Sequence, residues 1–202
     1  PVVHDGMVFI ADTGKRLHCV DAATGAGIWT HEVKGESWAT PLVADGKVYF
    51  ATRRGEFLTF AASREKRLLA EVNLGAGVSA TPVAANGTLY VADLGEVVAA
   101  DVATGEVKAH VAIPDSKFLN DVTCDGAKAY VSDMMGNTIY AIEDGKASVA
   151  ASGPELEFPN GLLVDAGKFI VGGWGSAPKA DFTTDTPGHI FSYDPATKKK
   201  TL

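Results

Sequence analysis

The chain has 202 residues, of which 46% are hydrophobic and 21% are charged, and this composition is typical of a globular domain. Its 25 acidic and 18 basic residues give a net charge of −7, which argues against nucleic acid as a partner because phosphate binding needs clustered Lys and Arg. No apolar run reaches the ~18 residues of a membrane span, and the two cysteines, Cys19 and Cys124, provide neither a disulfide framework nor a thiolate metal cage.

A turn with Asp-Gly, Asn-Gly or Asp-Ala-Gly, followed by a run of β-branched and aromatic residues, recurs along the chain. The anchor residues of the five copies are Phe9, Tyr49, Tyr90, Tyr130 and Ile170, and they are spaced by 40, 41, 40 and 40 residues. Such a regular spacing predicts one structural unit for each copy.

Each copy has room for four short strands. The first precedes the Gly turn, the second carries the anchor residue, and the third and fourth flank a second turn, as in Asp21-Ala22-Ala23-Thr24-Gly25. In that turn the Asp and Thr side chains can bond nearby backbone N–H groups. Four antiparallel strands in about 40 residues are typical of a propeller blade, so the sequence predicts an all-β fold, a single β-propeller domain of five repeats over residues 1–202. A β-sandwich with evenly spaced hairpins is the alternative.

The fifth copy is longer than the others. Two corresponding turns are 15 positions apart in the first copy, from Gly6 to Asp21, and 28 positions apart in the fifth, from Ala166 to Asp194. The 13 extra residues lie around 172–178 and have the composition of a loop. By the same spacing, closing a ring would need about 11 more residues of strand. The prediction is therefore either five blades of a larger propeller or a five-bladed ring that closes imperfectly.

The same turn and strand motifs recur in segments 5–10, 17–25, 40–49 and 81–87. Because of these motifs, residues 1 to about 93 resemble the pyrroloquinoline-quinone (PQQ)-type propeller repeats. Many proteins with these repeats are binding scaffolds, including outer-membrane assembly lipoproteins, and others are quinone-dependent dehydrogenases. The resemblance implies a periplasmic or other extracytoplasmic location. Bound PQQ is not expected, because the adjacent cysteines frequent in those dehydrogenases are absent.

A different resemblance rests on residues 118–122, 130–140 and 159–164, extended by 172–175 and 187–190. On these segments residues 88–202 resemble the gluconolactonase/regucalcin-like (senescence-marker-type) six-bladed propellers. The domain is accordingly divided into PQQ-like blades over 1–87 and gluconolactonase-like blades over 88–202. A natural fusion, an engineered or recombined hybrid, and a truncated propeller are all compatible with this division.

Asn120 and Asn160 are the strongest candidates for a functional site, because they lie 40 residues apart at equivalent places in two blades. Allowing for one extra residue in the turn, they align with Thr40 and Thr81, so these four polar residues are predicted to line the central channel. The resemblance to gluconolactonases implies that Asn120 and Asn160 take part in substrate and divalent-metal binding, with Asp121 beside them and Ca²⁺ or Zn²⁺ as the metal. The alternative is that Asn-Asp and Asn-Gly mark turns or β-bulges where the strands begin.

The chain departs from the gluconolactonase pattern in three places. The metal-binding glutamate of an early blade and the catalytic aspartate of a later blade have no counterpart, and Phe118 replaces the usual arginine. Two amides and one carboxylate also fall short of the roughly six to eight oxygens that Ca²⁺ prefers. The sequence therefore predicts a non-catalytic scaffold or ligand-binding propeller, with a small molecule or a protein as its partner. The alternative is a divalent-metal-dependent, lactonase-like hydrolase.

Three further features favour structural roles. Asp12, Asp93 and Asp133 recur at the ends of second strands, which predicts hydrogen bonding in the following turns. Met134-Met135 is predicted to pack in a hairpin, because Met fills irregular gaps. The lysine run 198–200 is predicted to keep an outer edge strand soluble.

Overall fold

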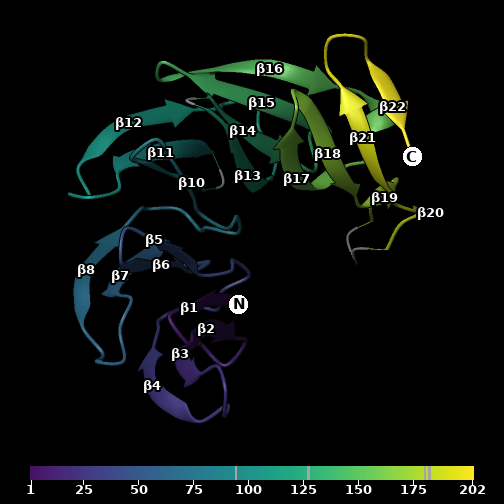
Figure 1. The fold of residues 1–202 in the computed structure, drawn as a ribbon. Helices are drawn as coiled ribbons and strands as arrows, with labels where there is room; N and C mark the ends of the chain where they lie inside the picture. Colours follow the sequence, from purple (N-terminus) through teal and green to yellow (C-terminus); the bar gives the residue numbers. More distant parts are fainter. Residues whose placement is uncertain (94, 127, 180, 182) are drawn as a thin grey trace.

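Five four-stranded antiparallel sheets, the blades, follow one another along the chain in the computed structural model, which describes residues 1–93, 95–126, 128–179, 181 and 183–202 (Figure 1). Blades 1 and 2 contain β1 (Val2–His4), β2 (Met7–Asp12), β3 (Arg16–Asp21), β4 (Gly27–Glu32), β5 (Leu42–Ala44), β6 (Lys47–Ala51), β7 (Glu56–Ala61) and β8 (Leu68–Asn73). Blades 3 and 4 contain β9 (Val83–Ala85), β10 (Thr88–Ala92), β11 (Glu96–Asp101), β12 (Val107–Ala112), β13 (Leu119–Asp125), β14 (Lys128–Asp133), β15 (Thr138–Glu143) and β16 (Lys146–Ser152).

Blade 5 carries an insertion between its second and third strands. It contains the 3₁₀ turn η1 (Pro154–Leu156) and the strands β17 (Pro159–Asp165), β18 (Lys168–Gly173), β21 (Ile190–Asp194) and β22 (Lys199–Thr201). The insertion, predicted as a loop, includes the two-stranded ribbon of β19 (Gly175–Ser176) and β20 (Thr186–Pro187). Gly175 has φ of 129°, and a Cβ there would lie 2.3 Å from the carbonyl oxygen of Thr186, so this ribbon requires glycine.

The predicted all-β propeller of five repeats is confirmed. The turn between the first and second strands of a blade explains why the sequence forms these hairpins. Asp5 and Gly6, between β1 and β2, have φ values of 44° and 71°, and the equivalent Asn86 and Gly87 have 49° and 70°. Two successive positive φ values define the type I′ turn, whose twist matches that of the flanking strands. The recurring Asp-Gly and Asn-Gly pairs therefore set the first hairpin of a blade.

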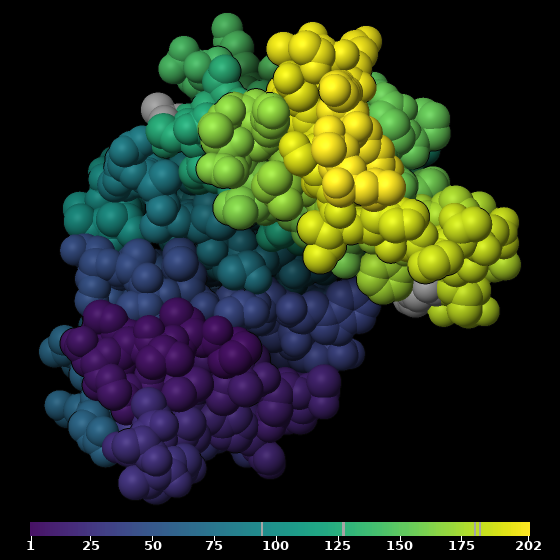
Figure 2. Space-filling view, turned by 45° about the vertical axis from the view of Figure 1, so that its right-hand side comes forward, coloured from purple at the N-terminus to yellow at the C-terminus, as the bar shows by residue number. Residues whose placement is uncertain are grey.

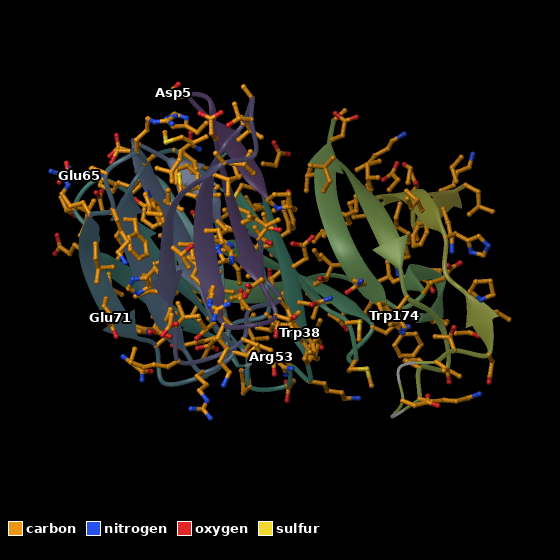
Figure 3. The ribbon with its side chains drawn as sticks, turned by 90° about the horizontal axis from the view of Figure 1, so that it is seen from below. Asp5, Trp38, Arg53, Glu65, Glu71 and Trp174 are labelled. Carbon is orange, nitrogen blue, oxygen red and sulfur yellow. The ribbon has the colours of Figure 1, made fainter. Side chains whose placement is uncertain are left out.

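The blades are arranged as an arc around a common centre, with the first strand of each blade on the inside and the fourth on the outside (Figure 1). Figures 1 and 3 both show an opening between blade 1 and blade 5, so the five blades do not close a ring. No helix in the described part of the chain has the length and apolar character that a membrane crossing requires.

Each pair of neighbouring blades shares its own hydrophobic cluster, because alternate strand residues point to opposite faces of a sheet. Phe9 and Leu17 of blade 1 are fully buried against Phe50 and Phe60 of blade 2. Separate clusters join blades 2 and 3, blades 3 and 4, and blades 4 and 5. The core is thus a series of interfaces between sheets, and each inner blade is covered on both faces.

The prediction of turn hydrogen bonds at the ends of second strands is confirmed. Asp12 accepts the Arg16 N–H at 3.0 Å, and Asp93 accepts N–H groups of the turn that follows it at 2.9 Å. Asp133 accepts the Gly136 N–H at 3.0 Å. The repeated aspartates therefore close the turn between the second and third strands.

Two predictions, for the methionine pair and for the lysine run, are confirmed only in part. Met135 is 39% exposed, so only Met134 packs inside. Lys198 and Lys199 are exposed at the edge, as predicted, whereas Lys200 of β22 is half-buried. Its Nζ binds the Glu157 carboxylate and lies 3.8 Å from the centre of the Phe191 ring. A cation over an aromatic face is attracted to the ring, so Lys200 holds β22 against β21 and the segment that precedes β17.

Acid is expected to weaken the outer turns of blades 1 and 3. Hydrogen bonds from the Thr24 hydroxyl and N–H, and then from Arg64, lower the pKa of Asp21 to about 2. The Thr104 N–H and the Lys108 ammonium likewise lower the pKa of Asp101 from 3.8 to about 2. A depressed carboxyl pKa contributes stability that is present above the unfolded value and is lost as pH falls through the folded value.

We therefore expect the melting temperature to drop as pH falls from about 4 to about 2. Thermal unfolding followed by circular dichroism across this range measures the drop, and the Asp101→Asn variant should show a smaller one. An unchanged drop in that variant would mean that Asp101 does not contribute to the acid sensitivity.

Candidate ligand pocket at the channel mouth

Asn120 and Asn160 both lie at β-bulges. The pairing of β13 with β14 shifts between Leu119 and Asp121, and that of β17 with β18 shifts between Pro159 and Gly161. A bulge re-aims the side chain of the extra residue, and here the two amides meet. The Asn120 Nδ2 donates to the Asn160 Oδ1 and, at 3.2 Å, to the Asn160 carbonyl oxygen. The one extra residue of the later repeats therefore lies in the bulge and not in the turn. The predicted alignment with Thr40 and Thr81 was wrong, because by register these threonines correspond to Asp121 and Gly161.

Thr40 and Thr81, the predicted counterparts in blades 2 and 3, also lie next to each other. The Thr40 N–H donates to the Thr81 Oγ1 at 3.0 Å. Both threonines are half-buried and lie two residues before the first strands of their blades. The structure therefore brings the four predicted residues together in two pairs, each joining two neighbouring blades.

Asp121 binds backbone groups of both blades. Its Oδ1 accepts the Val122 N–H at 3.0 Å, and its Oδ2 accepts the Leu162 N–H of blade 5 at 2.8 Å. Burial raises the pKa of Asp121, and these two N–H donors only partly oppose that shift. The carboxyl group therefore acts as a brace between blades 4 and 5, a role that depends on both bulges.

The metal role of Asn120, Asn160 and Asp121 stays a prediction. In the part of the chain that the structure describes, no three His, Cys, Asp or Glu residues gather closely enough to hold a metal ion. A divalent ion at the paired amides would have to compete with the Leu162 and Val122 N–H groups for the Asp121 oxygens.

Addition of CaCl₂ or ZnCl₂ checks this prediction by the change in melting temperature. A metal bound to the native state raises the melting temperature with ion concentration. If the three residues bind it, replacing both asparagines by Ala should abolish that rise. A rise that persists in the double variant would place the ion elsewhere, and the absence of any rise would contradict the metal site.

A pocket of about 280 Å³ opens beside the paired asparagines. Four large apolar side chains and the two amides line it, and they belong to Trp38, Phe118, Met134, Trp174, Asn120 and Asn160. Trp38 comes from the loop between β4 and β5, whereas the other residues belong to blades 4 and 5. Figure 3 shows Trp38, Arg53 and Trp174 on the same side of the arc, opposite the side that carries Asp5. The pocket thus lies at one mouth of the channel.

The pocket side chains are mounted on braced loops. Asp133 accepts the Phe118 N–H at 2.8 Å, and the Trp174 N–H donates to the Phe158 carbonyl at 3.0 Å. Trp38 is 50% exposed, and the Arg53 guanidinium lies 3.7 Å from the centre of its indole ring. This stacking holds the indole in place and keeps a positive charge at the edge of the pocket.

Trp38 and Trp174 were not among the predicted site residues. They occupy different positions in their repeats, so no spacing connects them. Each is a large aromatic residue in a turn-like segment with small neighbours, Ser37-Trp38-Ala39 and Gly173-Trp174-Gly175. Such an aromatic residue outside a strand is the signal that could have drawn attention to them.

The fold is similar to that of a known β-propeller. The crystal structure of Saccharomyces cerevisiae Sqt1 matches with a TM-score of 0.68 and 12% sequence identity, over 82% of this chain and 52% of Sqt1. The matched part is thus about half the length of Sqt1, and at this identity the similarity shows the fold alone. No curated protein sequence matches the chain.

The family model described as outer membrane protein assembly factor BamB matches residues 1–68 and 61–150. This confirms the resemblance to PQQ-type repeats, and the match continues beyond residue 87, where the predicted gluconolactonase-like part begins. That second resemblance receives no support from the comparisons and stays a prediction. The two matches together span residues 1–150 of 202, and the chain therefore belongs to the BamB family of PQQ-type repeat proteins.

Proposed function

We propose that this chain is a non-catalytic, protein-binding propeller that holds an apolar segment of a partner polypeptide at the channel mouth. The observation that carries the proposal is the pocket itself, in which Trp38, Phe118 and Trp174 surround a pair of amides. Aromatic side chains on rigid loops provide contact area at small entropic cost and are enriched among residues that dominate binding energy.

The amides suit a polypeptide ligand. The Asn120 Nδ2 donates to the Asn160 Oδ1, and each amide also carries donor and acceptor capacity that an extended backbone can use. Arg53 at the rim favours a partner segment with an acidic residue beside its apolar one. The family description names an outer membrane assembly factor, which supports a protein partner and an extracytoplasmic location.

Binding of a peptide panel tests the proposal, with tryptophan fluorescence as the readout because Trp38 and Trp174 line the pocket. Extended peptides with an aromatic or aliphatic residue next to an acidic one should bind, whereas the same peptides with Ser in place of the apolar residue should not. Loss of a central aromatic contact typically costs about 2 kcal/mol or more, so Trp174→Ala or Trp38→Ala should weaken binding at least about tenfold.

Met135→Ala is the matched control. Met135 is exposed and adjacent to Met134 in the sequence, but it does not line the pocket. Its replacement should leave the affinity unchanged. Peptide affinities that are equal in the Trp174→Ala, Met135→Ala and unmodified proteins would refute the proposed site.

The lactonase-like hydrolase is the second function that the sequence predicted, and it stays untested. It needs a metal and a carboxylate base, and Asp121, which follows Asn120 in the sequence, carries a half-buried carboxylate. The metal titration described above therefore also serves as its first test.

A further inference from the structure

A single tryptophan fills the outer part of the interface between blades 1 and 2. Trp29 of β4 lies between two rings, with 5.8 Å from its ring centre to that of Phe9 and 5.5 Å to that of Phe60. Its indole N–H donates to the Ser63 carbonyl oxygen at 3.1 Å, in the turn that joins β7 to β8. An indole has a large apolar surface and one polar group, and both are used here.

The corresponding position in blade 3 carries alanine. Strand pairing places Trp29 opposite Cys19 in blade 1 and Ala109 opposite Ala99 in blade 3. In both blades the register shifts directly after this pair, so the correspondence is unambiguous. Blade 3 therefore lacks the side chain that closes the outer part of the preceding interface.

The two rings that flank Trp29 do have counterparts beside Ala109. Tyr90 of blade 3 holds the register position of Phe9, and Ile142 of blade 4 holds that of Phe60. The walls of the indole site are thus repeated between blades 3 and 4, and the indole itself is replaced by a methyl group.

A pocket of about 440 Å³ lies at this place. Tyr90, Ala109 and Ile142 line it, together with Asp144 and Gly145 of blade 4. Ligand pockets commonly measure about 300–1,000 Å³, and an apolar cavity of about 150 Å³ already holds benzene. In Figure 2 the teal surface of blade 3 adjoins the green surface of blade 4. The pocket therefore lies between two inner blades and not at either end of the arc.

A short turn contributes to the size of this pocket. Asp144 and Gly145 alone join β15 to β16, with φ values of 50° and 71°, whereas residues 62–67 join β7 to β8. A Cβ on Gly145 would lie 4.0 Å from the Ala109 Cβ, so the two smallest side chains of the two blades face each other here. The Asp144 carboxylate provides oxygen acceptors in the turn, as the Ser63 carbonyl does for Trp29.

The interface between blades 2 and 3 shows that alanine alone does not open such a space. Ala70, opposite Thr59, also holds the position of Trp29, and the pocket beside it measures about 180 Å³. The turn that lines this smaller pocket is longer, with residues 102–106 between its strands. In addition, the Tyr49 hydroxyl donates to the carbonyl oxygen of residue 102 at 2.7 Å.

We propose that the pocket between blades 3 and 4 binds a small planar aromatic molecule of the size of indole, whose ring takes the place that Trp29 takes between blades 1 and 2. Tyr90 and Ile142 supply the walls, and Asp144 accepts a ring N–H. The ligand is a free molecule, because a tryptophan of another protein in this orientation would need its backbone where β12 lies. The site is separate from the channel mouth and does not depend on the function proposed for that pocket.

Indole is the probe that tests the site, in an NMR titration of the chain with labelled methyl groups. The methyl resonances of Ala109, Val111 and Ile142, which line the pocket, should shift with indole concentration and saturate at one molecule per chain. The absence of shifts up to the solubility limit of indole would overturn the proposal. Shifts of the Met134 methyl group in place of these three would also overturn it, because Met134 lines the channel mouth.

Ala109→Trp supplies the ring that blade 3 lacks and should abolish indole binding, while its circular dichroism should match that of the unmodified chain. Ala70→Trp is the matched control, because Ala70 holds the same repeat position but lines only the smaller pocket. It should bind indole like the unmodified chain. Binding that survives in Ala109→Trp, or that is lost in Ala70→Trp alone, would overturn the assignment. The titration of the unmodified chain tests the site even if Ala109→Trp fails to fold.

Discussion

Replacement of Asp133 by Ala is expected to lower the free energy of unfolding by about 3–5 kcal/mol. Asp133 has no exposed surface, and its carboxylate accepts backbone N–H groups from both sides of the blade. The Oδ1 atom binds the N–H groups of Phe118 and Gly136, and the Oδ2 atom binds that of Lys117 at 2.9 Å. Alanine would leave three donors without a partner, and a buried donor left unsatisfied costs about 1–3 kcal/mol.

Asp12 provides the matched control for this prediction, because it occupies the same repeat position in blade 1. It is half-buried, and water can reach the turn that it closes, so Asp12→Ala should change the stability far less. Urea unfolding of both variants measures the difference. Similar losses in the two variants would show that burial does not determine the contribution of this aspartate.

The Asp133→Ala substitution should also weaken peptide binding. The Phe118 side chain lines the pocket while its backbone N–H binds Asp133, and Met134 follows Asp133 directly. Pocket and turn are therefore parts of one hydrogen-bonded unit, and the stability of this turn preorganises the binding site.

Local chemistry made the blades predictable. Asp-Gly and Asn-Gly pairs specify I′ turns, and the alternation around Phe9 and Tyr49 specifies which face of each sheet is buried. The spacing of 40 residues also placed Asn120 and Asn160 in equivalent positions of neighbouring blades. These features depend on a few adjacent residues or on a regular repeat, and a single sequence contains both.

The pocket could not be predicted in the same way, because its residues come together through irregular parts of the chain. Trp38 reaches blades 4 and 5 from the loop between blades 1 and 2, and no repeat position relates it to Trp174. Asp121 was predicted as a metal neighbour, but its contact with the Leu162 N–H depends on a bulge in each of two strands. Bulges and long loops re-aim side chains, and the sequence pattern does not encode the new direction.

Phe60→Ala is expected to lower the free energy of unfolding by about 3–5 kcal/mol, the usual cost of truncating a buried aromatic residue. Phe60 is fully buried between blades 1 and 2, where its ring stacks on Trp29 at 5.5 Å and meets His31 edge-on at 4.9 Å. Thermal unfolding measures the loss, which should lower the melting temperature by roughly 10 °C in a chain of this size. A loss of about 1 kcal/mol or less would mean that the two blades repack around the gap.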